Sequence, residues 1–264
     1  MTYVAALDLD DTLLRSDYTL SLATRYTLRE WQARGCRIVI ATGRPPRSVG
    51  GSLPDELQGV PWICYNGAEI CEDGRTIYRN LLSTEDTRRI LLRLLDAMPA
   101  AVLGLEIDDV LYLNRPWQRP TAYELVDLLE VADRPAAKIL FFTDKAAGLS
   151  DTFSDLPPSA RVMVSDKYGL VQIMARTADK AQALRFLMAR WGLSMQHVVA
   201  FGDDINDVDM VQHSGIGVAV ENAIAEVKAV ADRVTLSNDE DGVGAVLREL
   251  MADGCSGDGH PSVV

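Results

Sequence analysis

The chain has 264 residues, of which 48% are hydrophobic, and a formal net charge of −12 at pH 7. This composition excludes an intrinsically disordered chain, and the length allows one large domain or two smaller ones. The negative charge argues against non-specific binding to nucleic acid or to anionic membranes, so an anionic substrate requires local cations. No apolar segment is long enough to span a bilayer and no signal peptide is evident, so we expect a cytoplasmic protein.

Apolar strands alternate with helices near both ends of the chain. A helix over 21–34 ends at Gly35 and leads into the apolar run 36–41, a spacing typical of a parallel sheet with right-handed crossovers. The N-terminal part is expected to hold strands at 3–7, 36–41 and 60–64, and a hairpin over 70–78 that turns at Asp73-Gly74. In the C-terminal part, helices are expected at 178–191, 208–212 and 223–230, and strands at 198–201 and 216–220.

Between these two parts the strict alternation stops, which is typical of a separate α+β domain. The expected helices there are 84–98 and 123–130, and the expected strands are 102–107, 110–113, 138–143, 161–165 and 170–174. We therefore predict an α/β fold, with a Rossmann-like parallel sheet core over 1–82 and 176–264 and an inserted α+β domain over 83–175. The tail over 253–261 is predicted to be disordered.

Residues 8–12, with the sequence Asp-Leu-Asp-Asp-Thr, directly follow the first apolar strand. In an extended chain, Asp8 and Asp10 point to the same face, about 7 Å apart at the backbone. Such a pair stays ionised only beside a cation or hydrogen-bond donors, and ligands of open α/β sheets bind beyond the carboxyl ends of strands. Magnesium is therefore the economical explanation, and an Asp-rich helix cap or turn is the alternative.

Thr42-Gly43 follows a second predicted strand. Gly43 lets backbone N–H groups approach an anion closely, and the Thr42 hydroxyl can donate to it. An ordinary strand-to-helix turn uses the same residue types, so this signal alone is weak.

Lys180 lies near the start of a predicted helix, for which Thr177 is the expected N-cap. At helical spacing Lys180 aligns with Leu184 and Leu187, on the apolar face that must turn inward. A lysine on a buried face requires an anion, although its long side chain could instead extend to solvent.

Residues 202–207, with the sequence Gly-Asp-Asp-Ile-Asn-Asp, follow another buried strand. Helix capping requires one such side chain and explains Asn206 or Asp207, but it does not explain three aspartates together. If the strands lie side by side, the acids, the threonine and the lysine form a site for one divalent cation and a phosphate-sized anion.

Together these four groups resemble the motifs of the haloacid dehalogenase superfamily of phosphohydrolases, in the form of its Cof-type subgroup. Residues 8–12 match its D-x-D-x-T motif, Thr42 its second motif, Lys180 its third and residues 202–207 its G-D-x-x-N-D motif. The subgroup carries a cap of type IIB, inserted between the second and third motifs. Further similarity lies at 66–68, 214–219, 222–223 and 236–243, and Ala181 departs by replacing a frequent glycine.

The resemblance implies a role for each site residue. Asp8 would be the nucleophile that forms an aspartyl-phosphate, and Asp10 would be the general acid and base. Mg²⁺ would be held by the Asp8 carboxylate, the Asp10 backbone carbonyl and Asp203, and Asp207 would hold Lys180 or a metal-bound water. The phosphoryl oxygens would be bound by Leu9, Thr42, Gly43, Lys180 and Asn206. Arg44 and Arg47 would contact the substrate or form surface ion pairs.

Three hypotheses follow for the activity. The leading one is a magnesium-dependent phosphatase, a monomer or weak homodimer, that acts on a small phosphorylated metabolite such as a sugar phosphate. A phosphomutase of the same superfamily would pass the phosphoryl group to substrate, and a requirement for a bisphosphate activator would favour it. A non-enzymatic phospho-acceptor also uses clustered acids, a threonine and a lysine, but that fold needs only about half this length.

Overall fold

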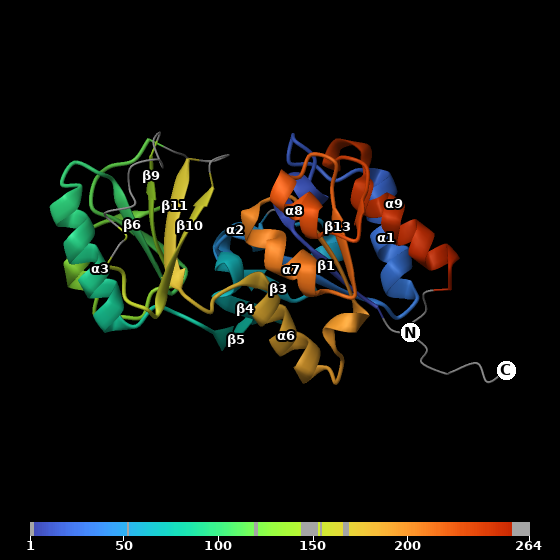
Figure 1. The fold of residues 1–264 in the computed structure, drawn as a ribbon, viewed down its shortest axis with the longest axis horizontal. Helices are drawn as coiled ribbons and strands as arrows, with labels where there is room; N and C mark the ends of the chain where they lie inside the picture. Colours follow the sequence, from blue (N-terminus) through green and yellow to red (C-terminus); the bar gives the residue numbers. More distant parts are fainter. Residues whose placement is uncertain are drawn as a thin grey trace. The chain divides into compact units, whose positions relative to one another are not determined.

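The computed structural model describes residues 3–51, 53–118, 121–143, 153, 155–165 and 169–254. The chain divides into two compact units: unit 1 comprises Met1–Tyr78 and Asp179–Val264, and unit 2 comprises Arg79–Ala178. Unit 1 carries a mostly parallel sheet and unit 2 a mostly antiparallel one, which confirms the predicted α/β fold with an inserted α+β part (Figure 1). Most of the tail for which disorder is predicted lies outside the described residues.

The sheet of unit 1 has eight strands in the order β14-β13-β12-β1-β2-β3-β4-β5. Neighbours from β14 to β3 are parallel, and β3 pairs with β4 in the antiparallel direction. β4 and β5 form the predicted hairpin, whose turn residues Asp73 and Gly74 have positive φ angles of 51° and 71°. The strands are β1 Val4–Leu7, β2 Arg37–Ala41, β3 Trp62–Cys64, β4 Glu69–Glu72, β5 Arg75–Arg79, β12 Val198–Gly202, β13 Ile216–Ala219 and β14 Arg233–Val234.

Helices cover both faces of this sheet. α6 and α7 pack against the face that carries Val4, Ala6 and Val39. α1 and α9 lie on the opposite side, where Arg248 donates to the Thr27 hydroxyl at 3.0 Å (Figure 1). The helices are α1 Leu22–Ala33, α2 Pro46–Gly50, α6 Lys180–Arg190, α7 Val208–His213, α8 Ala225–Val230 and α9 Gly242–Ala252.

β1 is an inner strand of this sheet, and its four residues are fully buried. Because both faces are covered, an apolar side chain is needed at every position, and each buried Val or Leu contributes about 1.5–3 kcal/mol. β1 pairs with β12 and with β2, so that Leu7 lies opposite Phe201 and Ile40. The three strands end at the same edge of the sheet, so the polar residues that follow them are brought together.

Unit 2 holds a sheet of six strands in the order β10-β11-β9-β6-β7-β8. All neighbours are antiparallel except β7 and β8. α3 and α4 cover one face, where Ile90, Leu105 and Phe141 belong to one apolar core. The elements are α3 Thr84–Ala97, β6 Leu103–Ile107, β7 Val110–Leu113, β8 Glu124–Leu125, α4 Leu128–Val131, β9 Lys138–Phe142, β10 Ala160–Ser165 and β11 Leu170–Ala175.

The prediction of one helix over 123–130 is wrong. Glu124–Leu125 instead form β8 beside β7, and the N–H of Val126 donates to the Leu113 carbonyl at 3.0 Å. The helix begins only at Leu128, because the Asp127 side chain caps it by accepting from the Leu129 N–H at 2.9 Å. Pairing with a neighbouring strand therefore overrides local helix propensity.

The predicted N-cap of α6 is also wrong. Asp179, not Thr177, caps this helix, and its side chain accepts from the N–H of Gln182 at 2.7 Å. The Thr177 hydroxyl instead accepts from the side-chain amide of Asn80 at 3.0 Å. The cap therefore lies immediately before Lys180, which becomes the first helical residue.

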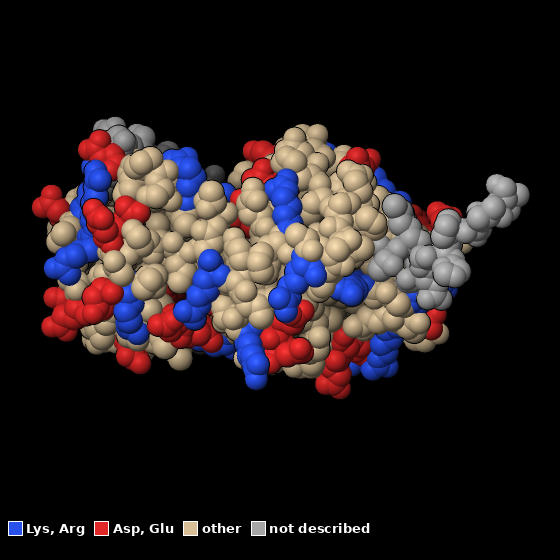
Figure 2. All heavy atoms as spheres, turned by 90° about the horizontal axis from the view of Figure 1, so that it is seen from below, with Lys and Arg blue, Asp and Glu red and all other residues tan. Residues whose placement is uncertain are grey.

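None of the helices in the described part of the chain is long and apolar enough to cross a membrane. On the face drawn in Figure 2, Lys and Arg side chains lie among Asp and Glu side chains. The net charge of −12 is therefore not gathered into one acidic patch on that face.

Candidate active site

Asp8 directly follows β1, and its backbone N–H donates to the Phe201 carbonyl at 3.2 Å, which extends the pairing with β12. The chain then turns sharply: Asp11 has a φ of 59°, and the N–H of Leu14 donates to the Leu9 carbonyl at 2.8 Å. Only 5% of Asp8 is exposed, so its carboxylate lies within the molecule. The Leu9 side chain is fully buried, so this residue can contact a ligand only through its backbone.

Lys180 is fully buried and joins two of the predicted site residues. Its Nζ donates to Asp8 Oδ1 at 2.6 Å and to Asp207 Oδ1 at 2.7 Å. Burial alone would lower the pKa of Lys180, but the carboxylates of Asp207 and Asp8 outweigh this effect and raise the pKa above its ordinary value. The alternative in which this lysine extends to solvent is therefore excluded.

The loop after β12 is shaped around Asp207. Its Oδ2 accepts from the backbone N–H groups of Asp203 and Asp204, at 3.1 and 3.3 Å. Gly202 is required by this close approach, since a Cβ there would lie 2.3 Å from the Cβ of Asp207. Asp203 is oriented separately, because its Oδ1 accepts from the Thr12 hydroxyl at 2.9 Å. Both oxygens of Asp207 are thus engaged by the protein.

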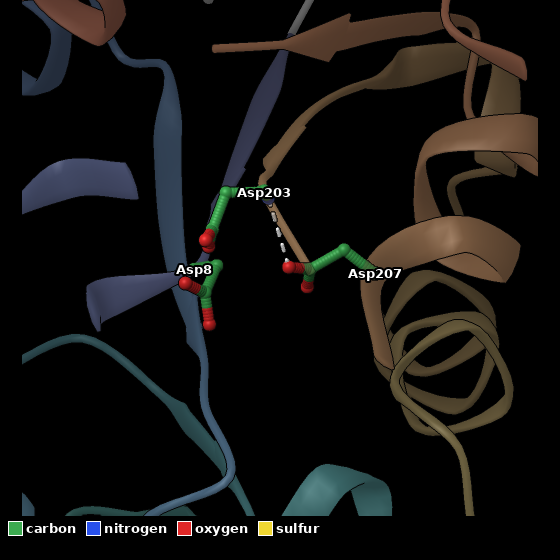
Figure 3. A group of neighbouring side chains, drawn as sticks. All are labelled: Asp8, Asp203 and Asp207. Carbon is green, nitrogen blue, oxygen red and sulfur yellow. Dashed lines mark hydrogen bonds between the residues drawn. The ribbon is translucent and has the colours of Figure 1, made fainter. Parts of the chain in front are cut away.

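Three buried carboxylates, Asp8, Asp203 and Asp207, gather beyond the ends of β1 and β12 (Figure 3). Each offers one oxygen, and these oxygens lie within 4.8 Å of one another. Burial raises the pKa of Asp8 well above its ordinary value; Lys180 opposes this, and the carboxylates of Asp207, Asp203 and Asp10 add to it. A single ammonium does not balance these charges, so a hard divalent cation with oxygen ligands fits beside Asp8 and Asp203, while Asp207 holds Lys180.

Thr42 and Gly43 follow β2, next to the strand that precedes Asp8. Asn66 lies beside them: a Cβ at Gly43 would lie 2.8 Å from its Oδ1, which accepts from Asn206 Nδ2 at 2.9 Å. The structure thus brings Gly43 and Asn206 together through Asn66, a residue that sequence analysis did not assign to the site. Its signal in the sequence was the similarity to the superfamily at 66–68, which assigned it no role, and in the structure Asn66 has a left-handed φ of 55°.

The two predicted arginines have different partners. Arg44 forms a two-pronged ion pair with Asp10 through Nη2 and Nε, with Nε at 2.8 Å from Oδ2. Its backbone N–H donates to the Thr42 hydroxyl oxygen at 3.1 Å, which leaves the hydroxyl hydrogen able to donate to an anion. Arg47 donates to the Tyr65 hydroxyl at 3.1 Å. Arg44 therefore contacts a predicted site residue directly.

Comparison with known proteins agrees with this geometry. The sequence model of the haloacid dehalogenase-like hydrolase family matches residues 5–247. The 5-amino-6-(5-phospho-D-ribitylamino)uracil phosphatase YitU of Bacillus subtilis is 28% identical, over 95% of this chain and 98% of that protein.

Solved structures of the same superfamily share this fold over 95% of the chain. BT1666 from Bacteroides thetaiotaomicron, a phosphatase of the HAD superfamily, has a TM-score of 0.83 at 26% identity, covering 95% of this chain and 96% of its own. The subclass IIB sugar phosphatase BT4131 also gives 0.83, at 22% identity, covering 95% and 99%, a likeness that shows the fold alone. The chain thus belongs to the haloacid dehalogenase-like hydrolase family, in its Cof-type subgroup, and is a phosphatase of that family.

Proposed function

We propose that this phosphatase depends on Mg²⁺ and hydrolyses small phosphorylated metabolites, such as sugar phosphates, through an aspartyl-phosphate formed on Asp8. The observation that carries the proposal is the contact of Lys180 with Asp8 and Asp207, at 2.6 and 2.7 Å, beside the buried Asp203. Nucleophile and substrate are both anionic, so a fixed cation beside the nucleophile lowers the repulsion between them. The name of the similar YitU phosphatase supports a small phosphorylated substrate.

The reaction has two steps. In the first, a carboxylate oxygen of Asp8 attacks phosphorus, the bond from phosphorus to the leaving oxygen breaks, and Asp10 gives that oxygen a proton. In the second, water attacks phosphorus, Asp10 takes up the proton of the water, and the bond between phosphorus and Asp8 breaks. Asp10 pairs with Arg44 in this structure, so it must separate from Arg44 before it reaches the leaving oxygen.

The residues that would hold Mg²⁺ are the carboxylates of Asp8 and Asp203 and the backbone carbonyl of Asp10. When bound, Mg²⁺ offsets the charge of the carboxylates and orients the phosphoryl group. The Thr12 hydroxyl, 2.9 Å from Asp203, fixes the orientation of that ligand. Asp207 serves Lys180 rather than the metal, since Lys180 and backbone N–H groups already occupy its oxygens.

The phosphoryl oxygens are bound by groups at the ends of several elements. The Thr42 hydroxyl and the Gly43 backbone follow β2, and Lys180 opens α6. The Asn206 amide is held in place by Asn66. Backbone N–H of Leu9 and the guanidinium of Arg44 complete the set. These cations and donors give an acidic protein a local site for a phosphate ester.

Unit 1 supplies every group that the phosphoryl transfer requires. These groups contact only the phosphoryl group, so they do not discriminate between one phosphate monoester and another. We therefore assign the choice of leaving group to unit 2, as a lid that selects the substrate and shelters the intermediate. Discrimination among metabolites comes from contacts to the part of the substrate beyond the phosphoryl group.

A screen of phosphorylated metabolites, with and without Mg²⁺, tests the proposal. We expect release of phosphate from several sugar phosphates, loss of this activity on treatment with a chelator, and its recovery with Mg²⁺ but not with Ca²⁺, which prefers more ligands at longer distances. Asp8→Asn is the control, because its amide cannot form the acyl phosphate. Mg²⁺ should also raise the melting temperature of the wild type, a readout independent of activity, and should do so less for Asp203→Asn.

Two results would contradict the proposal. Multiple turnovers by Asp8→Asn at the wild-type rate would remove Asp8 from its role as nucleophile. Full activity in thoroughly demetallated protein would remove the metal from the reaction.

A further inference from the structure

Two asparagines from the C-terminal part of the chain hold the turn that carries Asp10. Asn222 Nδ2 donates to the backbone carbonyl of Asp11 at 2.7 Å, and its Oδ1 accepts from the backbone N–H of Asn238 at 3.0 Å. Asn238 Nδ2 in turn donates to the Leu14 carbonyl at 3.0 Å. The two side chains therefore bind the turn at two backbone carbonyls, one immediately after Asp10 and one where the turn ends.

Asp11 is the residue of this turn whose backbone is strained. Its φ of 59° lies in the left-handed region, which is disfavoured for any residue with a Cβ. Asp10, just before it, is extended, with φ −74° and ψ 126°. Because the peptide unit between them is rigid, a rotation that lets Asp11 relax also moves the Asp10 backbone carbonyl and redirects its side chain. A hydrogen bond to the Asp11 carbonyl opposes that rotation.

Other contacts keep the surrounding loop attached independently of Asn222. Asp239 accepts from the backbone N–H and the hydroxyl of Ser16, at 2.9 and 2.8 Å. Asp241 pairs with Arg15 at 3.0 Å. Asn222 itself is exposed, so its replacement opens no cavity in the core. Variants at this position should therefore fold.

We propose that Asn222 is a positioning residue for the reaction: through the Asp11 carbonyl it fixes the backbone of Asp10, so that the Asp10 side chain, once released from Arg44, points toward the leaving oxygen that it protonates. Asn222 touches neither substrate nor metal in this role. Asn238 holds Asn222 in turn, through the backbone N–H that donates to its Oδ1. The inference rests on the proposed function of Asp10 as general acid.

The test varies the leaving group, with the full-length protein and saturating Mg²⁺. Nitrophenolate departs without a proton, whereas phenolate gains from protonation, so the ratio of kcat/KM for para-nitrophenyl phosphate to that for phenyl phosphate reports the acid step. Asn222→Asp keeps the size and the acceptor for Asn238 but loses the donor to Asp11. Asn222→Ala loses both the donor to Asp11 and the acceptor for Asn238, without adding a charge. Glu221→Gln, at the adjacent exposed position, is the matched control.

We expect both Asn222 variants to lose roughly ten- to a hundredfold in kcat/KM for phenyl phosphate and much less for para-nitrophenyl phosphate, the cost of a slightly misplaced acid. Their melting temperatures should stay near that of the wild type, and Glu221→Gln should keep both rates. A purely structural role would lower the rates for the two substrates equally. Equal losses, or wild-type rates for both, would overturn the inference.

Asp10→Asn separates this inference from the proposed function on which it rests. If Asp10→Asn raises the ratio of kcat/KM for para-nitrophenyl phosphate to that for phenyl phosphate and the Asn222 variants do not, only the role of Asn222 is overturned. If Asp10→Asn itself keeps the wild-type ratio, Asp10 is not the general acid, and the proposed function and this inference fail together.

Discussion

Lys180 and its two carboxylate partners depend on one another because all three are buried. The ammonium is fully enclosed, and Asp8 and Asp207 each accept a hydrogen bond from it. Bringing a charge into the interior carries a large desolvation cost, which partners offset only while they are present. The cost of removing one partner therefore exceeds the net contribution of the intact group to stability.

Lys180→Met is accordingly expected to lower the free energy of unfolding of unit 1 by about 3–5 kcal/mol at neutral pH, besides abolishing turnover. Denaturant unfolding in magnesium-free buffer, followed by circular dichroism, measures the loss. Adding Asp207→Asn should recover part of the stability, because one uncompensated charge is removed, but none of the activity. A Lys180→Met protein as stable as the wild type would contradict this account of the ion pairs.

Sequence patterns place some site residues and miss others for a physical reason. Helical spacing places Lys180 on the inward face with Leu184 and Leu187, because that alignment is local, but only the contacts of its ammonium exclude an extension to solvent. Asn66 approaches Gly43 and Asn206 from a turn in which two consecutive residues, Tyr65 and Asn66, have positive φ angles of 51° and 55°. Periodicity does not report such a conformation. Nor does it report that Arg44 pairs with Asp10, which requires the tertiary fold.

At the scale of elements, ion pairs with the buried carboxylate of Glu56 connect α1 to the short turn Asp55–Leu57. Arg25 Nε lies 3.1 Å from Glu56 Oε1, and Arg29 Nη2 lies 2.5 Å from the same oxygen. Burial alone would raise the pKa of Glu56, but a backbone donor and the two arginines outweigh it, so the pKa lies below its ordinary value of 4.5. The ion pairs therefore stabilise the folded state only while Glu56 is ionised.

The pH dependence of stability follows from this shift. A carboxyl whose pKa is lower in the folded state contributes stability above its unfolded pKa and loses it as the pH falls through the folded value. Glu56→Gln should therefore be less stable than the wild type at neutral pH, by roughly 1 kcal/mol because Arg25 and Arg29 are partly exposed. The difference should shrink below pH 4.5.

Melting temperatures of the two proteins across this pH range measure the effect. Asp55→Asn, the adjacent and exposed acid, makes the same change of charge and should follow the wild type. A deficit of Glu56→Gln that is independent of pH would show that the loss comes from packing rather than from the ion pairs.

Elements with strong local signals are those that sequence analysis places correctly. β1, β2 and β12 are continuous apolar runs because both faces of the sheet are covered, and α3 begins where Ser83 caps it. The two-residue β8 depends on β7, a neighbour that no local pattern reveals. α9 was not predicted because Gly242 and Gly244 fall in its first turn, where glycine weakens a helical signal.

At the scale of the whole molecule, the proposed function assigns phosphoryl chemistry to unit 1 and choice of substrate to unit 2. In unit 2, Ile139 and Phe141 face α3 and α4, so alternation places Lys138 on the opposite face of the sheet. There Lys138 Nζ donates to Gln172 Oε1 at 2.8 Å, and Glu106 lies opposite Lys138 in the pairing of β6 with β9. All three polar residues are buried, which costs desolvation free energy that an apolar face would avoid. This cost is understandable if the face recognises a polar leaving group.

Gln172→Glu tests that role with a side chain of nearly the same shape, which still accepts from Lys138. If unit 2 selects the leaving group, this variant should shift the relative kcat/KM among several sugar phosphates by roughly tenfold, because a site built around a polar contact discriminates strongly when that contact changes. Hydrolysis of para-nitrophenyl phosphate, which depends on unit 1, should change little. Arg89→Gln, an exposed position on α3, is the matched control and should keep the wild-type ranking. If Gln172→Glu lowers the melting temperature but leaves the ranking of sugar phosphates unchanged, the polar face serves stability alone and unit 2 does not choose the substrate through it.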